Sequence, residues 1–205
     1  MKKIAILGST GSIGVTLINL IKKDRKKIKI VLLTANKNYK RIINQTKIFK
    51  VKNIIITDKK SYLIAKDILK NKSINVFNDF DSLNKIFENK RIDYIMSAIS
   101  GFDGLNPTLD IIKFTKTIAI ANKESIICGW SLIQKKLNKF NTKFIPVDSE
   151  HFSIWSLMNN LKNSNTEKVF ITASGGPFKD LPLKDFKLIT PAQALNHPSW
   201  SMGKK

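Results

Sequence analysis

The fold of this chain is decided by Ile4-Ala5-Ile6-Leu7 and the turn that follows at once, Gly8-Ser9-Thr10-Gly11-Ser12-Ile13-Gly14. The apolar run predicts a buried strand, the glycines predict a tight turn, and residues 15–21 have the spacing of an amphipathic helix. In this order the segments direct backbone N–H groups and a helix N-terminus at an anion, typically the pyrophosphate of a dinucleotide. Because the spacing is G-x-x-G-x-x-G and not the commoner G-x-G-x-x-G, an ordinary tight turn stays an alternative.

The rest of the chain alternates between strand-like apolar runs and segments with helical periodicity. Such alternation is typical of an α/β fold, in which strands pair in parallel and helices cover both faces. We therefore expect a doubly wound, mostly parallel sheet with ligands bound beyond the carboxyl ends of its strands. The predicted strands are residues 3–7, 28–35, 53–57, 75–77, 94–99, 117–121 and 143–147, and the predicted helices include 61–69, 81–87, 105–114 and 124–137.

The pattern changes after Val147, where we place a domain boundary. Residues 1–147 form the predicted sheet domain, and residues 148–205 are expected to begin a second domain of α+β type. In this second part we predict a helix over 152–161, a strand over 168–173 and irregular chain from 174 onward. Roughly 58 residues are few for an independent hydrophobic core, so this domain is expected to be incomplete.

The composition indicates a globular protein without a membrane anchor. Of its 205 residues 42% are hydrophobic, but the apolar runs are far shorter than the ~20 residues that span a bilayer. The first residues lack the pattern of a secretory leader. A single cysteine, Cys128, excludes an internal disulfide and fits a reducing compartment. We expect a cytoplasmic protein in which Cys128 is buried and inert.

A formal net charge of +21 raises the alternative of a nucleic-acid-binding module. Arginine, whose planar fork suits base readout, occurs only at Arg25, Arg41 and Arg91, and the lysines are spread along the whole sequence. Lys, Asn and Ile are abundant together, as an A/T-rich coding sequence would produce. We therefore expect a basic surface that helps to attract anionic ligands, and no nucleic-acid partner.

The ends of two predicted strands bear on the cofactor and the substrate. Asn36, Lys37 and Asn38 stand where an NAD site usually has an acidic residue for the ribose 2′-OH. A lysine between two amides would attract the 2′-phosphate of NADP, unless Lys37 is simply one more surface lysine. Lys123 follows the strand 117–121 and could reach a substrate oxyanion or phosphate, or lie solvated at a helix start.

Asp148 and Glu150 follow the strand 143–147 and suggest a cation site. Two carboxylates at positions i and i+2 can converge on one hard divalent cation, and oxygen ligands favour Mg²⁺ or Mn²⁺ over zinc. Two carboxylates are an incomplete set, so a third ligand is expected. The alternative, which the spacing alone favours, is a helix N-cap at Asp148 or Ser149 with Glu150 in the first turn.

Two later segments have the residues of ligand-binding loops. Ser174-Gly175-Gly176 offers a hydroxyl and backbone N–H groups that suit a phosphate, or forms a plain chain reversal. His197 and Trp200 lie in a predicted loop over 196–203, which suggests a lid that closes over a ligand. In the alternative, Trp200 only packs this loop down.

Together, the blocks at 8–14, 121–125, 147–150, 174–178 and 196–203 resemble the 1-deoxy-D-xylulose 5-phosphate reductoisomerase family. The resemblance covers the whole chain in the family's order, and five blocks make it specific. It implies a Rossmann-like NADP-binding domain, then a catalytic domain with Mg²⁺ or Mn²⁺, and it favours metal ligation over capping at 148–150. It also implies conversion of the sugar phosphate 1-deoxy-D-xylulose 5-phosphate to 2-C-methyl-D-erythritol 4-phosphate in non-mevalonate isoprenoid biosynthesis, by a homodimer when full length.

The resemblance also implies roles for individual residues. NADPH contacts are implied for Thr10, Gly11, Ser12, Ile13, Asn36, Lys37, Asn38, Asn122, Glu124 and Gly203, with Asn36 departing from a glycine of the family. Metal ligation is implied for Asp148 and Glu150. Substrate contacts are implied for Lys123, Ser149, Glu150, Ser174, His197 and Trp200, and catalytic roles for Lys123, Glu150 and His197.

Members of this family continue beyond the position of Lys205 with residues that complete the phosphate and metal sites. We therefore expect the 205-residue chain to bind NADPH but to have little or no turnover. Two alternatives stay open: another NADP-dependent reductase, of the short-chain or homoserine-dehydrogenase kind, and the basic nucleic-acid-binding module. The first explains the glycine turn but not the blocks at 147–150 and 196–203 together.

Overall fold

The structure, a computed structural model, describes residues 1–160, 166–171, 175–196 and 198. The chain forms two compact units, Met1–Asn160 and Leu161–Lys205. The first unit contains the sheet, and the second contains short helical segments. The predicted domain boundary after Val147 stays a prediction.

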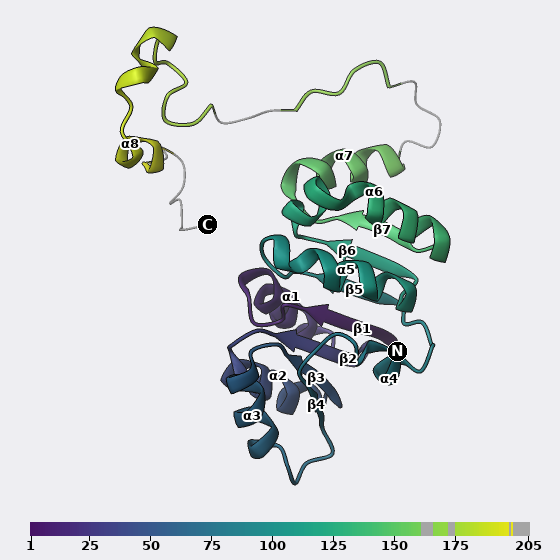
Figure 1. Cartoon of the computed structure of the whole chain (residues 1–205). Coiled ribbons are helices and arrows are strands. Elements are labelled where there is room, and N and C mark those ends of the chain that lie inside the picture. The colour runs from purple at the N-terminus through teal and green to yellow at the C-terminus, as the bar shows by residue number, and fades with distance from the viewer. Residues whose placement is uncertain (161–165, 172–174, 197, 199–205) are drawn as a thin grey trace. The chain divides into compact units, whose positions relative to one another are not determined.

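Seven parallel strands in the described part of the chain form one sheet, in the order β4-β3-β2-β1-β5-β6-β7 (Figure 1). The sheet extends from its centre in two directions, and the order reverses between β1 and β5, which is where such sheets bind ligands. This confirms the predicted doubly wound α/β fold. The strands are β1 (Lys2–Leu7), β2 (Ile28–Ala35), β3 (Asn53–Ile56), β4 (Asn75–Phe77), β5 (Tyr94–Ser97), β6 (Thr117–Ile120) and β7 (Lys143–Pro146).

The central strand β1 sets the register on both sides of this reversal. Ile6 lies beside Leu33 of β2 on one side and beside Met96 of β5 on the other. The carboxyl-terminal halves of β1, β2, β5 and β6 are buried, and their side chains are mainly apolar on both faces. This double burial explains why the strands read as continuous apolar runs in the sequence.

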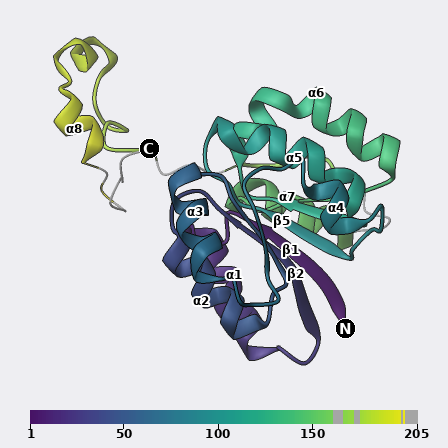
Figure 2. The ribbon, with the colours of Figure 1, turned by 60° about the horizontal axis from the view of Figure 1, so that its bottom comes forward.

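Helices cover both faces of the sheet (Figure 2). One face is covered by α1 (Ser12–Lys23), α2 (Tyr39–Phe49) and α3 (Lys59–Ile68), whose buried residues Ile18, Ile42 and Ala65 join the core there. The other face is covered by α4 (Leu83–Phe87), α5 (Leu105–Ile111), η2 (Ile112–Phe114) and α6 (Lys123–Phe140). The helix α7 (Ser149–Asn160) follows β7.

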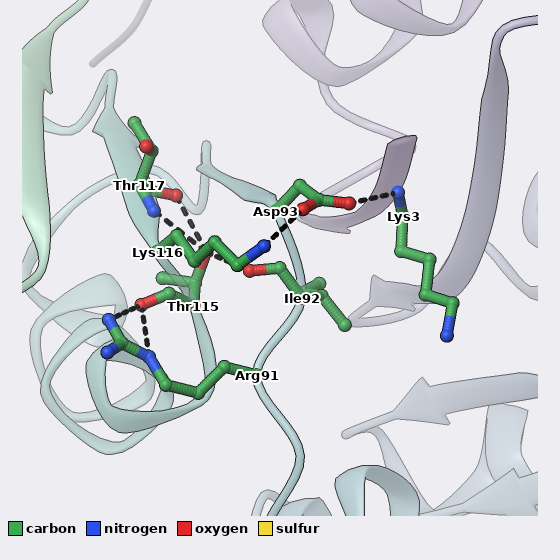
Figure 3. A network of polar contacts seen from close by, with 7 residues as sticks. All are labelled: Lys3, Arg91, Ile92, Asp93, Thr115, Lys116 and Thr117. Carbon is green, nitrogen blue, oxygen red and sulfur yellow. Dashed lines mark hydrogen bonds and ion pairs between the residues drawn. The ribbon is translucent and has the colours of Figure 1, made fainter. Parts of the chain in front are cut away.

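A polar network joins the amino ends of β1, β5 and β6 (Figure 3). The carboxylate of Asp93 accepts hydrogen bonds from the backbone N–H of Lys3 at 2.9 Å and from Lys116 Nζ at 3.0 Å. These contacts, the Lys3 N–H above all, lower the pKa of Asp93. Arg91 donates from Nε to the carbonyl oxygen of Thr115 at 3.0 Å. The network therefore fastens three neighbouring strands at the edge of the sheet where they begin.

Two expectations from the sequence are wrong. Cys128 is exposed, because Ser125 and Gly129 are the residues of that helix turn that face the core. The described residues 168–171 of the predicted strand 168–173 are not in a strand. Phe170 there is 84% exposed, and within the described chain no neighbouring strand pairs with this segment, so its backbone has no ladder to join.

The predicted irregular segment from 174 onward contains two short helical pieces. These are η3 (Leu183–Leu188) and α8 (Pro191–Leu195). Thr190 and Gln193 form a capping box at the start of α8, a pattern that is readable in the sequence. No helix in the described ranges has the length and apolar character needed to cross a membrane.

Candidate functional site

The turn between β1 and α1 packs so closely that a side chain on either of two of its glycines would force the backbone to shift. Gly8 has a φ of +75°, and a Cβ there would lie 2.6 Å from the carbonyl oxygen of Ala98. A Cβ on Gly14 would lie 2.3 Å from the carbonyl oxygen of Gly8. At Gly11, which has a φ of −75°, the nearest described atom, Gly8 O, would be 3.5 Å away. Packing therefore explains Gly8 and Gly14 but not Gly11.

Gly11 is explained by the space in front of it. It is the N-cap of α1, and among the described residues no side chain caps this helix and no acidic residue lies in its first turn. The first N–H groups of a helix have no carbonyl partner within the helix and concentrate partial positive charge. Without a side chain at Gly11, an anion can approach these N–H groups closely.

A cleft of about 680 Å³ opens beside this turn, within the usual range for small-molecule sites. Thr10, Gly11 and Asn36 line it on the side of β1 and β2. The loop after β5, including Ile99 and Phe102, lines the other side. The cleft thus lies at the reversal of strand order, where a dinucleotide is expected. The residues present fit such a cofactor in volume and in their exposed N–H groups.

Residues of α2 hold the glycine turn in place. Ser9 Oγ donates to Gln45 Oε1, and Gln45 Nε2 donates to the carbonyl oxygen of Ser9, both at 2.8 Å and both buried. Gly8 N–H donates to Thr34 Oγ1 at 2.9 Å, and Arg41 donates from a terminal guanidinium nitrogen to the carbonyl oxygen of Thr10 at 3.0 Å. No local pattern in the sequence predicts these contacts, although a polar Gln45 on the apolar face of an amphipathic helix is a recognisable signal.

Residues 36–38 follow β2 and differ in their roles: one lines the cleft and another makes a local contact. Asn36 lines the cleft and donates from Nδ2 to Thr57 Oγ1 at 2.8 Å. Asn38 caps α2 by accepting a hydrogen bond from the backbone N–H of Arg41 at 3.1 Å. Lys37 is exposed, and its charge adds to the lowering of the Asp58 pKa, which is due chiefly to hydrogen bonds from Ser61.

The buried side chain of Asn122 holds the loop after β5 in place by hydrogen bonds. Its side chain is 3% exposed and donates from Nδ2 to the carbonyl oxygens of Ile99 and, at 2.6 Å, Gly101. Its Oδ1 accepts from the backbone N–H of Ser125 at 2.9 Å and so caps α6. Asn122 therefore shapes the wall of the cleft, while the next residues, 123 and 124, are exposed in the first turn of α6.

Asp148 caps α7, as the spacing alone indicated. Its Oδ1 accepts a hydrogen bond from the backbone N–H of His151 at 2.8 Å and lies 2.7 Å from His151 Nδ1. Partial burial acts to raise the pKa of Asp148, but the hydrogen bonds from His151 outweigh it, so the pKa is lowered. Ser149 Oγ donates to Glu150 Oε2 at 2.9 Å. Both contacts from His151 use Oδ1 of Asp148, which leaves Oδ2 as the oxygen to face a cation.

The carboxylates of Asp148 and Glu150 are the type of ligand that a hard divalent cation prefers. Carboxylate oxygens are the ligands that Mg²⁺ and Mn²⁺ prefer. Within residues 1–160, 166–171, 175–196 and 198, however, no group of three or more acidic, His or Cys side chains could hold a metal ion. Metal ligation by Asp148 and Glu150 therefore stays a prediction, and the expected third ligand is not among the described residues.

Four residues of the predicted site lie outside the described residues. They are Ser174, His197, Trp200 and Gly203. Their implied contacts with substrate and cofactor stay predictions, as do the individual roles of the described site residues.

The profile of the 1-deoxy-D-xylulose 5-phosphate reductoisomerase family matches residues 4–129. The chain belongs to this family. The profile of the C-terminal domain of 1-deoxy-D-xylulose 5-phosphate reductoisomerase matches residues 144–205. Membership of the reductoisomerase family replaces the alternative of a short-chain or homoserine-dehydrogenase type of reductase.

Relatives named 1-deoxy-D-xylulose 5-phosphate reductoisomerase match the chain over its full length. The one from Pelagibacter ubique is 68% identical over 206 residues, and the one from Clostridium novyi is 41% identical over 207. Each alignment covers 100% of this chain but 53% and 54% of the respective relative. The chain thus spans about half the length of the curated relatives that it matches.

Solved structures of reductoisomerases have the same fold. The enzyme from Zymomonas mobilis in complex with NADPH is 34% identical, with a TM-score of 0.84 over 96% of this chain and 52% of that one. A structure of the enzyme with NADPH, fosmidomycin and magnesium is 27% identical, with a TM-score of 0.77 over 99% of this chain and 52% of that one. The sheet and the glycine turn described above are therefore those of a reductoisomerase.

Proposed function

We propose that this protein converts 1-deoxy-D-xylulose 5-phosphate to 2-C-methyl-D-erythritol 4-phosphate with NADPH and Mg²⁺ or Mn²⁺. The observation that carries the proposal is the uncapped N-terminus of α1, which meets a cleft of about 680 Å³ at the reversal of strand order. The similar structures in complex with NADPH and with magnesium support the choice of cofactor and metal. We further propose that the enzyme acts in the cytoplasm as a homodimer.

The glycine turn would hold the cofactor phosphates. Ser12 and Ile13 would present their N–H groups at the start of α1, and Gly11, whose own N–H donates to the carbonyl oxygen of Gly8, leaves room for the pyrophosphate. Thr10 is the fourth proposed contact in this turn. Asn36, Lys37 and Asn38 at the end of β2 would receive the adenosine ribose and its 2′-phosphate. Asn122 and Glu124, at the start of α6, and Gly203 complete the proposed contacts. The nicotinamide supplies the hydride, and the protein orients it toward the substrate.

Carboxylates after β7 would hold the metal ion. Asp148 and Glu150 are the proposed ligands, and Asp148, whose pKa is lowered from its ordinary value, is ionised at neutral pH. A bound divalent cation polarises substrate oxygens and stabilises the negative charge that develops on them during rearrangement. Lys123, Ser149 and Glu150, together with Ser174, His197 and Trp200, are the proposed substrate contacts, with Lys123, Glu150 and His197 as catalytic residues.

The proposal is tested by product formation. The chain is incubated with NADPH, 1-deoxy-D-xylulose 5-phosphate and Mn²⁺, and NADPH oxidation and the product are followed by absorbance and mass spectrometry. We expect saturable NADPH binding and little or no turnover, because the described residues include the two proposed metal ligands but no third one. Product that requires all three additions supports the proposal. A folded chain without affinity for NADPH contradicts it, and robust turnover contradicts the expectation of low activity.

A further inference from the structure

Arg41 joins the two segments that face the ribose end of the proposed cofactor site. We propose that Arg41 is the residue that makes this site prefer NADPH to NADH, by binding the 2′-phosphate. The inference rests on the proposed NADPH site and deepens it, since it assigns the discrimination between the two cofactors to one side chain.

The position of Arg41 follows from two hydrogen bonds. Its guanidinium donates to the carbonyl oxygen of Thr10 at 3.0 Å, in the glycine turn. Its backbone N–H donates to Asn38 Oδ1 at 3.1 Å, in the segment after β2. In sites of this type the adenosine ribose lies at the end of the second strand, near the pyrophosphate turn. Thr10 and Asn36 line the cleft, so Arg41 is held at the rim where a 2′-phosphate would project.

The charge of Arg41 is available to an anion. A guanidinium has five N–H donors, and within the described chain one of its terminal nitrogens is used, by Thr10. No carboxylate of the described residues forms an ion pair with Arg41. The remaining donors have the fork geometry that binds phosphate oxygens in pairs.

The surroundings of Arg41 also favour a bound anion. Lys40 and Arg41 lie in the first turn of α2, which contains no acidic residue among those described. Two cations at the positive end of a helix dipole destabilise it, and a bound dianion would offset this cost. Lys37, exposed in the segment between β2 and α2, would bring a further positive charge to the same anion.

The test compares NADPH and NADH affinities of the unmodified chain with those of Arg41→Gln and Arg41→Lys. For Arg41→Gln we expect the dissociation constant of NADPH to rise about tenfold or more and that of NADH by less than about threefold. Arg41→Lys keeps the charge but loses the forked guanidinium. Its preference for NADPH over NADH should therefore lie between those of the unmodified chain and Arg41→Gln. Lys47→Gln removes one positive charge from the last turn of the same helix and should leave the ratio of NADH to NADPH dissociation constants unchanged.

The outcomes separate the inference from the function on which it rests. If Arg41 only held Thr10 in place, Arg41→Gln would lower the affinities for NADPH and NADH equally. Equal losses of affinity would overturn the inference. So would an unchanged ratio in Arg41→Gln. Either result leaves NADPH binding by the unmodified chain intact, whereas a folded, unmodified chain that fails to bind NADPH overturns the proposed function itself. Adenosine 2′,5′-bisphosphate and adenosine 5′-monophosphate can be used as competitors. Arg41→Gln should lower the affinity for the first more than that for the second, as it does for NADPH and NADH.

Discussion

Gly11 and Gly14 lie three residues apart in one turn but are glycines for different reasons. At Gly14 a Cβ would collide with the backbone of Gly8 and Ser9, at 2.3 and 2.6 Å. At Gly11 the protein leaves room for a Cβ, and the constraint comes from the ligand that we propose. Gly14 is therefore required for the stability of the fold, and Gly11 for the proposed binding.

Alanine substitutions separate these two roles. We expect Gly14→Ala to lower the free energy of unfolding by about 1–3 kcal/mol, since backbone must shift to admit the methyl group. We expect Gly11→Ala to keep its stability but to lose about tenfold or more in NADPH affinity. Urea unfolding and fluorescence titration measure the two effects. A Gly11→Ala variant that binds NADPH as the unmodified chain does would show that no phosphate approaches this position.

The sequence contained the glycine turn but not the contacts that hold it. The turn is local, so its spacing after an apolar run could be recognised. Ser9 and Gln45 are 36 residues apart, and Thr10 and Arg41 are 31 apart, and both pairs meet only because α2 docks beside β1. The resemblance assigns Asn122 to the cofactor, but the hydrogen bonds of its side chain with Ile99, Gly101 and Ser125 could not be predicted from the sequence. Such long-range contacts depend on the assembled sheet and have no local pattern.

At the scale of elements, α7 shows that one residue can serve as a cap and as a proposed metal ligand. Asp148 satisfies the backbone N–H of His151 through Oδ1. Asparagine is an equally good N-cap but lacks the negative charge. Asp148→Asn should therefore keep α7 folded while it weakens Mn²⁺ binding about tenfold or more.

Asp148→Ala is the matched comparison, because it removes both the cap and the charge. It should destabilise α7 by about 1 kcal/mol in addition to losing the metal. Mn²⁺ titration followed by electron paramagnetic resonance, beside circular dichroism, distinguishes the variants. Equal Mn²⁺ affinity in the unmodified chain and Asp148→Asn would exclude Asp148 as a ligand.

The network at the amino ends of the strands gives the stability a defined pH dependence. The pKa of Asp93 is lowered by the folded structure, first by the N–H of Lys3 and then by Lys116. Its contribution to stability is therefore complete above the unfolded pKa of about 3.9 and is lost as the pH falls through the lower folded value.

Asp93→Asn should thus be less stable than the unmodified chain at pH 6, and the difference should shrink toward pH 3. Urea unfolding at a series of pH values measures this. Lys136, whose ion pair with Asp110 is largely exposed, offers a control: Lys136→Gln should change stability little at any of these pH values. A difference for Asp93→Asn that grows as the solution becomes acidic would contradict the assigned role.

Strands could be predicted from the sequence where burial in the sheet requires apolar residues, and could not be predicted reliably elsewhere. All seven predicted strands of the sheet are present. The inner strands are buried between helices and read as apolar runs, whereas the edge strands β4 and β7 are only partly buried. The segment 168–173 has the composition of a strand, yet its described part has no partner, and composition alone cannot supply one. Likewise, Cys128 lies in an apolar run whose helical phase places it outside.

At the scale of the whole molecule, the fold arranges charge that looks scattered in the sequence. Lysines occupy the last turns of most helices of the first unit, whose C-termini point toward the amino ends of the strands, away from the cleft. Cations stabilise these negative helix ends, so part of the net charge of +21 has a structural role. Two of the three arginines have structural contacts: Arg25 lies over Phe49, and Arg91 binds the carbonyl oxygen of Thr115.

This arrangement predicts weak, non-specific affinity for nucleic acid. A labelled oligonucleotide should lose measurable binding by about 150 mM salt, because only screened lysine contacts would hold it. NADPH binding, which also uses backbone N–H groups in a cleft, should persist at that salt. Saturable oligonucleotide binding there, in competition with NADPH, would support the nucleic-acid-binding alternative.

The most direct test of the account is an NMR titration of the ¹⁵N-labelled chain with NADPH. We predict saturable shifts of the backbone amides of Gly11, Ser12 and Ile13 at the start of α1, and unchanged amides at Lys3 and Asp93 on the opposite edge. Absence of shifts in the glycine turn, or shifts confined to the opposite edge, would contradict the assignment of this cleft to the cofactor.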